Sequence, residues 1–145
     1  MNKIRQAVLS DLAAFLAFDA LASPGNSRAT ELVRGIESGK CWIAEVDAKP
    51  IGYAFLKGEF FGFDFIELIY VDRNFRRRGA GRALIEQLER ECKTSKLFTS
   101  TNESNTAMKG LLERCGYSPS GIIHNLDNGD PEVVFMKKMR TADSK

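Results

Sequence analysis

The sequence has few of the residues that build metal or thiol chemistry. It holds one histidine, His124, and three cysteines, Cys41, Cys92 and Cys115, which stand far apart and form no C-x-x-C pair. This spacing gives neither a metal-binding cluster nor a Cys/His catalytic dyad, so we expect no metal cofactor. An odd number of scattered cysteines is typical of unpaired structural thiols in a reducing compartment.

Charge bias and long apolar runs are also missing. The 21 basic and 19 acidic residues leave a formal net charge of +2, which is too balanced for a dedicated nucleic-acid-binding protein. No apolar run approaches the ~20 residues that cross a bilayer, and the N terminus, MNKIRQAVLSD, lacks the apolar segment of a signal peptide. We therefore expect a cytoplasmic protein with no nucleic-acid or membrane partner.

Apolar periodicity and turn residues divide the chain into short elements. At 145 residues it fits one domain, predicted over 1–140, with 141–145 as a frayed tail. Ser10 is expected to cap the first helix and segment 47–50 to form a hairpin turn. Alternation of strands and helices in this order predicts a mixed sheet with helices on both sides. The predicted elements are strand 3–8, helices 11–21 and 27–36, strands 41–46, 51–57 and 63–71, helix 80–93, strand 96–100, helix 105–114, and strands 117–124 and 132–138.

The loop RRRGAGR at 76–82 connects an apolar strand to an amphipathic helix. The first N–H groups of a helix have no intrahelical acceptor, and the helix dipole adds partial positive charge there. Gly79 and Gly81 lack Cβ atoms, so an anion can approach the backbone and positive φ angles cost little. These features favour a phosphate or pyrophosphate seat over a loop of solvated arginines. The loop matches neither the Walker pattern nor the dinucleotide fingerprint, which needs a glycine where Leu84 stands.

Two spaced motifs resemble those of the GNAT superfamily of N-acyltransferases. The segment from Val71 to Leu84, V-x-x-x-F-R-x-x-G-x-G-R-x-L, is similar to the acyl-CoA signature of the family. The segment from Asn105 to Tyr117, N-T-A-M followed by L-L-E-R-C-G-Y, is similar to a second family pattern. The opening I-R-x-A-x-x-x-D at 4–11 and the element order agree, so the resemblance spans nearly the whole chain.

The resemblance implies a fold and a cosubstrate. The fold is α/β of mixed type, a twisted sheet of about seven strands flanked by about four helices, with the fourth and fifth strands, 63–71 and 96–101, splayed apart. The cosubstrate is acetyl-CoA, whose pantetheine arm would enter the splay and whose pyrophosphate would bind the loop amides. The implied cofactor-binding residues are the strand residues Ile69, Tyr70 and Val71, the loop residues Arg76, Arg77, Arg78, Gly79, Ala80, Gly81 and Arg82, and the side chain of Asn105.

Glu67 is the candidate catalytic base. It interrupts the apolar strand FIELI at 65–69, and a buried carboxylate there is suited to take a proton from an ammonium group. Strand alternation places it on the same face as Ile69 and Val71. The resemblance supports an acidic residue on this strand, but a structural ion pair with a neighbouring Lys or Arg explains Glu67 equally well.

The leaving-group acid departs from the family pattern. Leu112 stands where relatives often carry a catalytic tyrosine, and Ser100 stands where some relatives carry an acidic base. The thiolate, with a thiol pKa of about 8.5, can leave unassisted or through water. Tyr70 and Tyr117 are substitute acids, although each is better explained as a packing residue.

The sequence says little about which amine accepts the acetyl group. Helix region 27–39 and the aromatic stretch EFFGFDF at 59–65 would border the acceptor site, and the phenylalanines could form an acceptor wall, a dimer contact or, most commonly, core. The acidic loop 127–132 could steer a cationic amine, although a solvated turn is the better explanation.

These observations predict an acetyl-CoA-dependent N-acetyltransferase that acts on a primary amine of a small molecule or peptide by direct attack on the thioester. Whether the chain forms a homodimer stays an open question. The main alternative is a non-catalytic acyl-CoA-binding sensor on the same fold, which the missing tyrosine and the unsettled base keep open. A nucleic-acid module is disfavoured by the charge balance.

Overall fold

Antiparallel pairing builds most of the sheet, and short turns connect the three strands 41–46, 49–60 and 63–71. The computed structural model describes residues 2–140, and the predicted tail at 141–145 lies outside them. Seven strands form one sheet in the order β1-β2-β3-β4-β5-β7-β6, in which β4 and β5 are parallel. The strands are β1 (Lys3–Gln6), β2 (Cys41–Val46), β3 (Lys49–Phe60), β4 (Phe63–Val71), β5 (Lys96–Asn102), β6 (Ser118–Ile123) and β7 (Glu132–Lys138).

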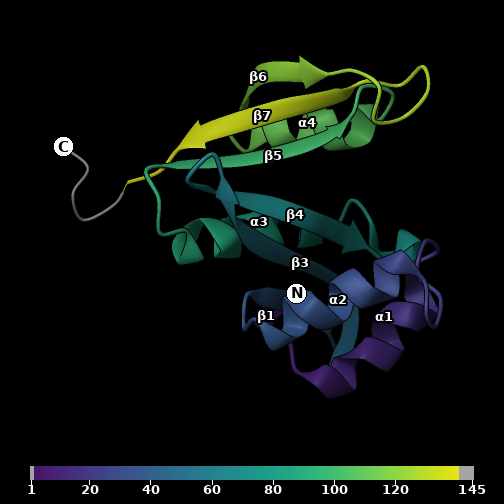
Figure 1. Cartoon of the computed structure of the whole chain (residues 1–145). Helices are drawn as coiled ribbons and strands as arrows, with labels where there is room; N and C mark the ends of the chain where they lie inside the picture. The colour runs from purple at the N-terminus through teal and green to yellow at the C-terminus, as the bar shows by residue number, and fades with distance from the viewer. Residues whose placement is uncertain (1, 141–145) are drawn as a thin grey trace.

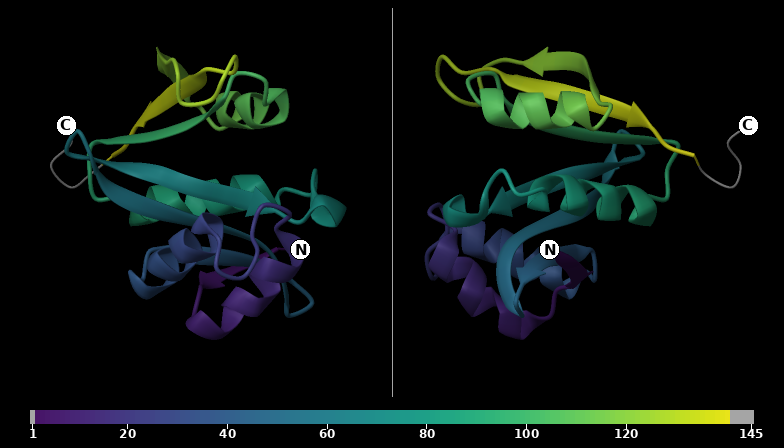
Figure 2. Two further views of the ribbon diagram at one scale, coloured as in Figure 1. Left: turned by 45° about the vertical axis from the view of Figure 1, so that its right-hand side comes forward. Right: turned by 180° about the vertical axis from the view of Figure 1, so that it is seen from behind.

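Helices cover both faces of the sheet (Figures 1 and 2). One core joins the sheet to Leu84 and Leu112, and a second joins its other face to Phe15 and Leu32. Within residues 2–140, no helix has the length and apolar character that a membrane span requires. Helices α3 (Ala80–Glu91) and α4 (Thr106–Arg114) pack on the first core, and α1 (Leu12–Phe18) and α2 (Ser27–Glu37) pack on the second. Two short 3-10 helices complete the chain, η1 (Leu9–Asp11) and η2 (Arg73–Phe75).

Strands β4 and β5 are joined over only part of their length. Their pairing runs from Asp64 opposite Leu97 to Ile66 opposite Thr99. Beyond this point β4 continues beside β3 and β5 beside β7, so the two strands diverge (Figure 1). The Thr99 hydroxyl donates to the Ile66 carbonyl at 3.1 Å where they part. The predicted splay is confirmed, and we call its closed end, at Ile66 and Thr99, the fork.

The start of the first helix differs from its prediction. Ser10 lies inside η1, and Asp11 occupies the N-cap of α1 without a capping hydrogen bond. The Asp11 carboxylate instead accepts from the Val8 N–H at 2.8 Å and from Arg5 at 2.8 Å. Arg5 also donates to Glu45 at 2.8 Å, so this network joins β1, η1 and β2. A tertiary partner therefore displaces the local cap that the sequence favours.

The β2–β3 turn is tighter than predicted. Asp47 and Ala48 both have positive φ, 51° and 64°, as in a two-residue hairpin turn. Val46 pairs with Lys49, so Pro50 lies in β3 rather than in the turn.

Candidate active site

The loop 76–82 is a turn whose backbone N–H groups are available to a ligand. Gly79, with φ 85°, is the N-cap of α3, a left-handed conformation that suits glycine. Within residues 2–140, no N–H group of this loop donates a hydrogen bond to another backbone group. The loop therefore has the unused donors and the positive helix end that an anion seat needs.

Arg76 is held by the end of β4. Its Nε donates to the Val71 carbonyl at 2.9 Å, and its guanidinium carbon lies 5.2 Å from the centre of the Tyr70 ring. Arg76 therefore stabilises the turn that leads from β4 into the loop.

The other loop arginines differ in how far their charges are engaged. Arg82 forms an exposed ion pair with Glu86 at 3.4 Å. Arg78 lies over the Phe75 ring, with its guanidinium carbon 5.3 Å from the ring centre. Arg77 is exposed and has φ 63°, which is costly for a residue with a Cβ. Arg77 and Arg78 thus present positive charge to solvent beside the N terminus of α3.

Gly81 has a packing role that the sequence argument missed. A Cβ on Gly81 would lie 3.0 Å from Leu111 Cδ2 of α4 and 4.0 Å from Val71 Cγ2. The missing side chain therefore lets α3 and α4 approach each other. At Gly79 the nearest atom to such a Cβ, Asn2 Nδ2, is 3.8 Å away, so there the positive φ, and not crowding, calls for glycine.

The edge of β4 beyond the fork presents backbone groups in alternation. The Asp72 N–H donates to Ile51 of β3 at 2.7 Å, so Val71 and Ile69 direct their N–H and C=O groups away from β3. Tyr70 directs its own groups toward β3. Of the three strand residues predicted to bind pantetheine, this alternation favours Ile69 and Val71.

Glu67 lies beside the fork, at a β-bulge. Consecutive β3 residues 55 and 56 lie opposite Leu68 and Ile66, so Glu67 is the extra residue. The alternation of side chains between the two faces of a strand is interrupted at a bulge. The prediction that Glu67 shares a face with Ile69 and Val71 assumed an uninterrupted strand, so it has no basis here. Glu67 is half-buried, and no Lys or Arg of residues 2–140 forms an ion pair with it. The structural ion pair considered above is therefore absent from this part of the chain.

Asn105 and Tyr117 have local partners. Asn105 caps α4, since its Oδ1 accepts from the Met108 N–H at 3.0 Å, which leaves its Nδ2 group for other contacts. The Tyr117 hydroxyl donates to Glu89 at 2.9 Å, and burial together with the Glu89 charge raises the pKa of Tyr117. Leu112 is buried in the core. Tyr117 is therefore a packing residue, as the sequence favoured.

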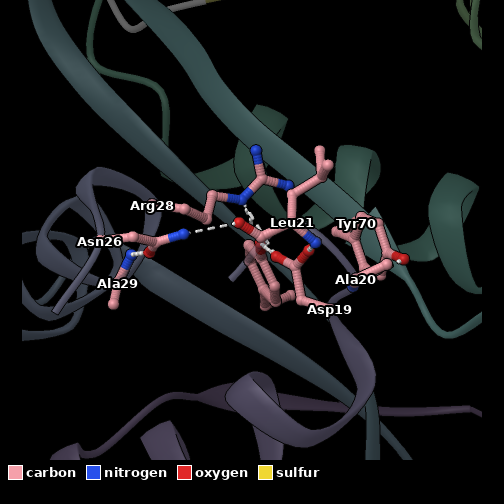
Figure 3. A network of polar contacts seen from close by, with 8 residues as sticks. Asp19, Ala20, Leu21, Asn26, Arg28, Ala29 and Tyr70 are labelled. Atoms are coloured by element: carbon pink, nitrogen blue, oxygen red, sulfur yellow. Dashed lines mark hydrogen bonds and ion pairs between the residues drawn. The ribbon is translucent and has the colours of Figure 1, made fainter. Parts of the chain in front are cut away.

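The segment between α1 and α2 is fixed against the sheet by a buried carboxylate (Figure 3). The fully buried Asp19 side chain accepts from Arg28 Nε at 3.0 Å and from the Tyr53 hydroxyl. The Ala20 N–H donates to the Tyr70 hydroxyl at 3.3 Å, and the Arg28 guanidinium carbon lies 5.8 Å from the Tyr70 ring centre. Tyr70 thus joins this segment to β4. No short sequence motif predicts this role.

The phenylalanines of the aromatic stretch 59–65 do not form part of the buried core, although core is where such residues most commonly lie. Phe60, Phe63 and Phe65 are only half-buried, and Phe60 and Phe63 pack on Phe98 with ring centres 5.1 Å and 5.6 Å away. Phe61, in the β3–β4 turn, is 87% exposed. The stretch forms a surface cluster at the end of β4 remote from the loop 76–82.

Comparison with known proteins decides the family. The model of the acetyltransferase (GNAT) family matches residues 10–117. The chain belongs to this family. A crystal structure of a GNAT-family acetyltransferase from Bacillus cereus is similar, with a TM-score of 0.88 and 35% identity over 97% of this chain and 99% of the other. Membership confirms the predicted fold, the acetyltransferase class and acetyl-CoA as the acyl donor.

More distant structures share the fold. The ribosomal-protein-S18-alanine N-acetyltransferase from Escherichia coli has a TM-score of 0.80 at 20% identity, covering 98% of this chain and 96% of the other. An acetyltransferase from Bacillus anthracis in complex with acetyl coenzyme A has a TM-score of 0.79 at 19% identity, covering 96% and 100%. No curated protein sequence matches the chain.

Proposed function

We propose that this GNAT acetyltransferase moves the acetyl group of acetyl-CoA to a primary amine of a small molecule or peptide, by direct attack of the amine on the thioester. The observation that carries the proposal is the fork, where the edge of β4 that β5 leaves unpaired begins at Glu67. The Escherichia coli protein that shares this fold is named as an N-acetyltransferase of an alanine in a ribosomal protein, which supports an amine acceptor. We also propose that residues 1–140 form a single domain.

The residues beyond the fork suit an acyl-CoA. Ile69 and Val71 would bind the pantetheine arm through backbone groups on the open edge of β4. The amides of 77–82 would bind the pyrophosphate, and Arg77 and Arg78 would add charge-assisted hydrogen bonds to phosphate oxygens. Asn105 would donate from its side-chain amide.

Glu67 is the proposed general base. An acceptor ammonium must lose a proton before its nitrogen can attack, and a half-buried carboxylate beside the fork can take that proton. The Ile69 N–H is the candidate donor to the developing oxyanion. The C–N bond forms, the C–S bond breaks, and the nitrogen loses its second proton to water. The thiolate leaves unassisted or takes a proton from water, because Leu112 has none to give.

A matched pair of charge removals tests the pyrophosphate seat. Arg77→Gln with Arg78→Gln removes two charges from the loop, whereas Arg90→Gln with Arg114→Gln removes two from the C-terminal turns of α3 and α4. Calorimetric titration should show acetyl-CoA binding weakened about 10-fold or more by the loop pair and changed less than about twofold by the control pair. Equal losses would show that only overall charge matters.

Glu67→Gln tests the base. We expect kcat to fall on the order of 100- to 10,000-fold, with an unchanged affinity for acetyl-CoA. Release of CoA, followed with a thiol reagent, measures turnover. Full turnover across pH would end the assignment. Wild-type protein that binds acetyl-CoA but releases no CoA with any amine would favour the sensor.

Location and assembly stay predictions. Cell fractionation would test the cytoplasmic location, and sedimentation of the purified protein would test whether it forms a homodimer.

A further inference from the structure

A second carboxylate, that of Glu132 at the end of the acidic loop 127–132, reaches the fork from β7. Ser100 is the first β5 residue beyond the last β4–β5 pair, just as Glu67 is the first on β4. The Ser100 hydroxyl donates to Glu132 Oε2 at 2.7 Å. Glu132 is the first residue of β7, 32 positions away along the chain. The fork therefore has one acidic residue on each arm, Glu67 directly and Glu132 through Ser100.

Strand register places Glu132 and Ser100 on the same face. Glu132 lies opposite Asn102, and Ser100 lies opposite Val134. Side chains alternate along strands, so these positions share the face opposite Leu97 and Phe135, which pack into the core beneath α3 and α4. A diagonal neighbour on one face is within reach of a long side chain. Glu132 therefore leans along β7 toward the fork on the face that α4 leaves uncovered.

No ion pair holds the Glu132 carboxylate in the part of the chain that the structure describes. Glu132 is half-buried, and the polar partner that holds it is the neutral Ser100 hydroxyl. The adjoining acidic loop is fastened to the end of β5, because Asn102 donates to Asp127 at 2.9 Å and the Ser104 hydroxyl to Asp130 at 2.6 Å. These neighbours add negative charge and no compensating cation. A partly desolvated carboxylate of this kind favours binding a cationic group.

We propose that Glu132, held in position by Ser100, binds the ammonium group of the acceptor and orients it at the fork. This inference rests on the proposed function and narrows its acceptor to amines that are cationic at neutral pH. One ammonium proton passes to Glu67 while the nitrogen keeps a hydrogen bond to Glu132. The nitrogen then attacks the thioester carbon, the C–N bond forms and the C–S bond breaks, and the second nitrogen proton passes through water to the departing thiolate. Glu132 is an acceptor-binding residue, and Ser100 is its positioning residue.

Steady-state kinetics of Glu132→Gln test this role with four probe amines: spermidine, lysine, kanamycin and a peptide with an N-terminal alanine. For each probe that the wild type acetylates, KM for the amine should rise on the order of 10- to 100-fold, since a charge-assisted hydrogen bond is lost. The affinity for acetyl-CoA, measured by calorimetry, and the pH at the midpoint of the kcat profile should stay unchanged. Glu132→Asp, which keeps the charge, should recover part of the loss.

Ser100→Ala and Glu103→Gln complete the design. Ser100→Ala should raise KM for the amine about threefold to tenfold and should add nothing in the Glu132→Gln background, because Ser100 acts through Glu132. Glu103 is exposed at the end of β5, and its neutralisation should change KM by less than about twofold.

Each other outcome has a definite meaning. An unchanged KM for the amine in Glu132→Gln would overturn the inference while leaving the proposed function intact. A shifted pH profile would make Glu132 a base rather than a binding residue, and an equal loss of acetyl-CoA affinity would place it in the donor site; both overturn the inference. A wild type that releases no CoA with any probe would count against the proposed function itself, and with it this narrowing of the acceptor.

Discussion

Gly81→Ala separates two explanations for a glycine in the first turn of α3. If the absent Cβ serves an approaching phosphate, alanine should weaken the binding of acetyl-CoA and leave stability unchanged. If it serves the contact between α3 and α4, alanine should lower stability and leave binding unchanged. The geometry favours the second explanation, because the Cβ would point at Leu111 of α4.

The expected magnitude follows from that contact. The new Cβ would lie 3.0 Å from Leu111 Cδ2, well inside the ~3.5–4.0 Å of favourable carbon contacts. Overpacking costs about 1–3 kcal/mol, whereas replacing glycine by alanine within a helix returns up to about 1 kcal/mol. Leu111 is half-buried, so its side chain can yield. We expect a net loss of about 1 kcal/mol, which lowers Tm by about 2–4 °C.

Urea unfolding and calorimetry measure the two effects. Leu111→Ala removes the crowded neighbour, so the double variant should recover most of the loss due to Gly81→Ala, with a coupling energy of about 1 kcal/mol. Acetyl-CoA affinity should stay within about twofold of wild type. Additive losses, or a variant of wild-type stability that binds acetyl-CoA tenfold more weakly, would refute the packing explanation.

Three further predictions concern strain, pH and thiol chemistry. Arg77→Gly should raise the free energy of unfolding by about 0.5–1 kcal/mol in urea, because the φ of 63° suits glycine; a lower Tm would contradict this. Burial opposes ionisation of Asp11, but hydrogen bonds from Arg5 and the Val8 N–H outweigh it and lower the pKa of Asp11. Asp11→Asn should therefore cost about 1–2 kcal/mol at pH 7, and this cost should shrink as pH falls below about 4, the unfolded pKa; a cost that stays constant down to pH 3 would count against it. Burial raises the pKa of Cys41 to about 12, so iodoacetamide at pH 8 should leave Cys41 unmodified until urea unfolds the protein, as peptide mass mapping would show.

The pattern of neighbouring residues in the sequence predicted many of the strands and helices. The apolar run of β4 was predicted at 63–71 as the structure has it, and the bounds of α3 and α4 were predicted to within one or two residues. These features depend on neighbours in the chain, such as apolar side chains three or four positions apart on one face of a helix. The same holds for the loop 76–82, whose donors follow from its place before a helix.

What the sequence by itself determined is therefore the set of elements, the family and the free backbone donors of the loop 76–82, since each is encoded in short stretches of residues. Only the tertiary structure decided that Glu67 occupies a bulge, that Gly81 faces Leu111 and that Ser100 holds Glu132 beside the fork. The physical reason is register: which residues of β3, β4, β5 and β7 lie opposite one another depends on pairing between distant segments, and a shift of one residue would turn each side chain to the other face.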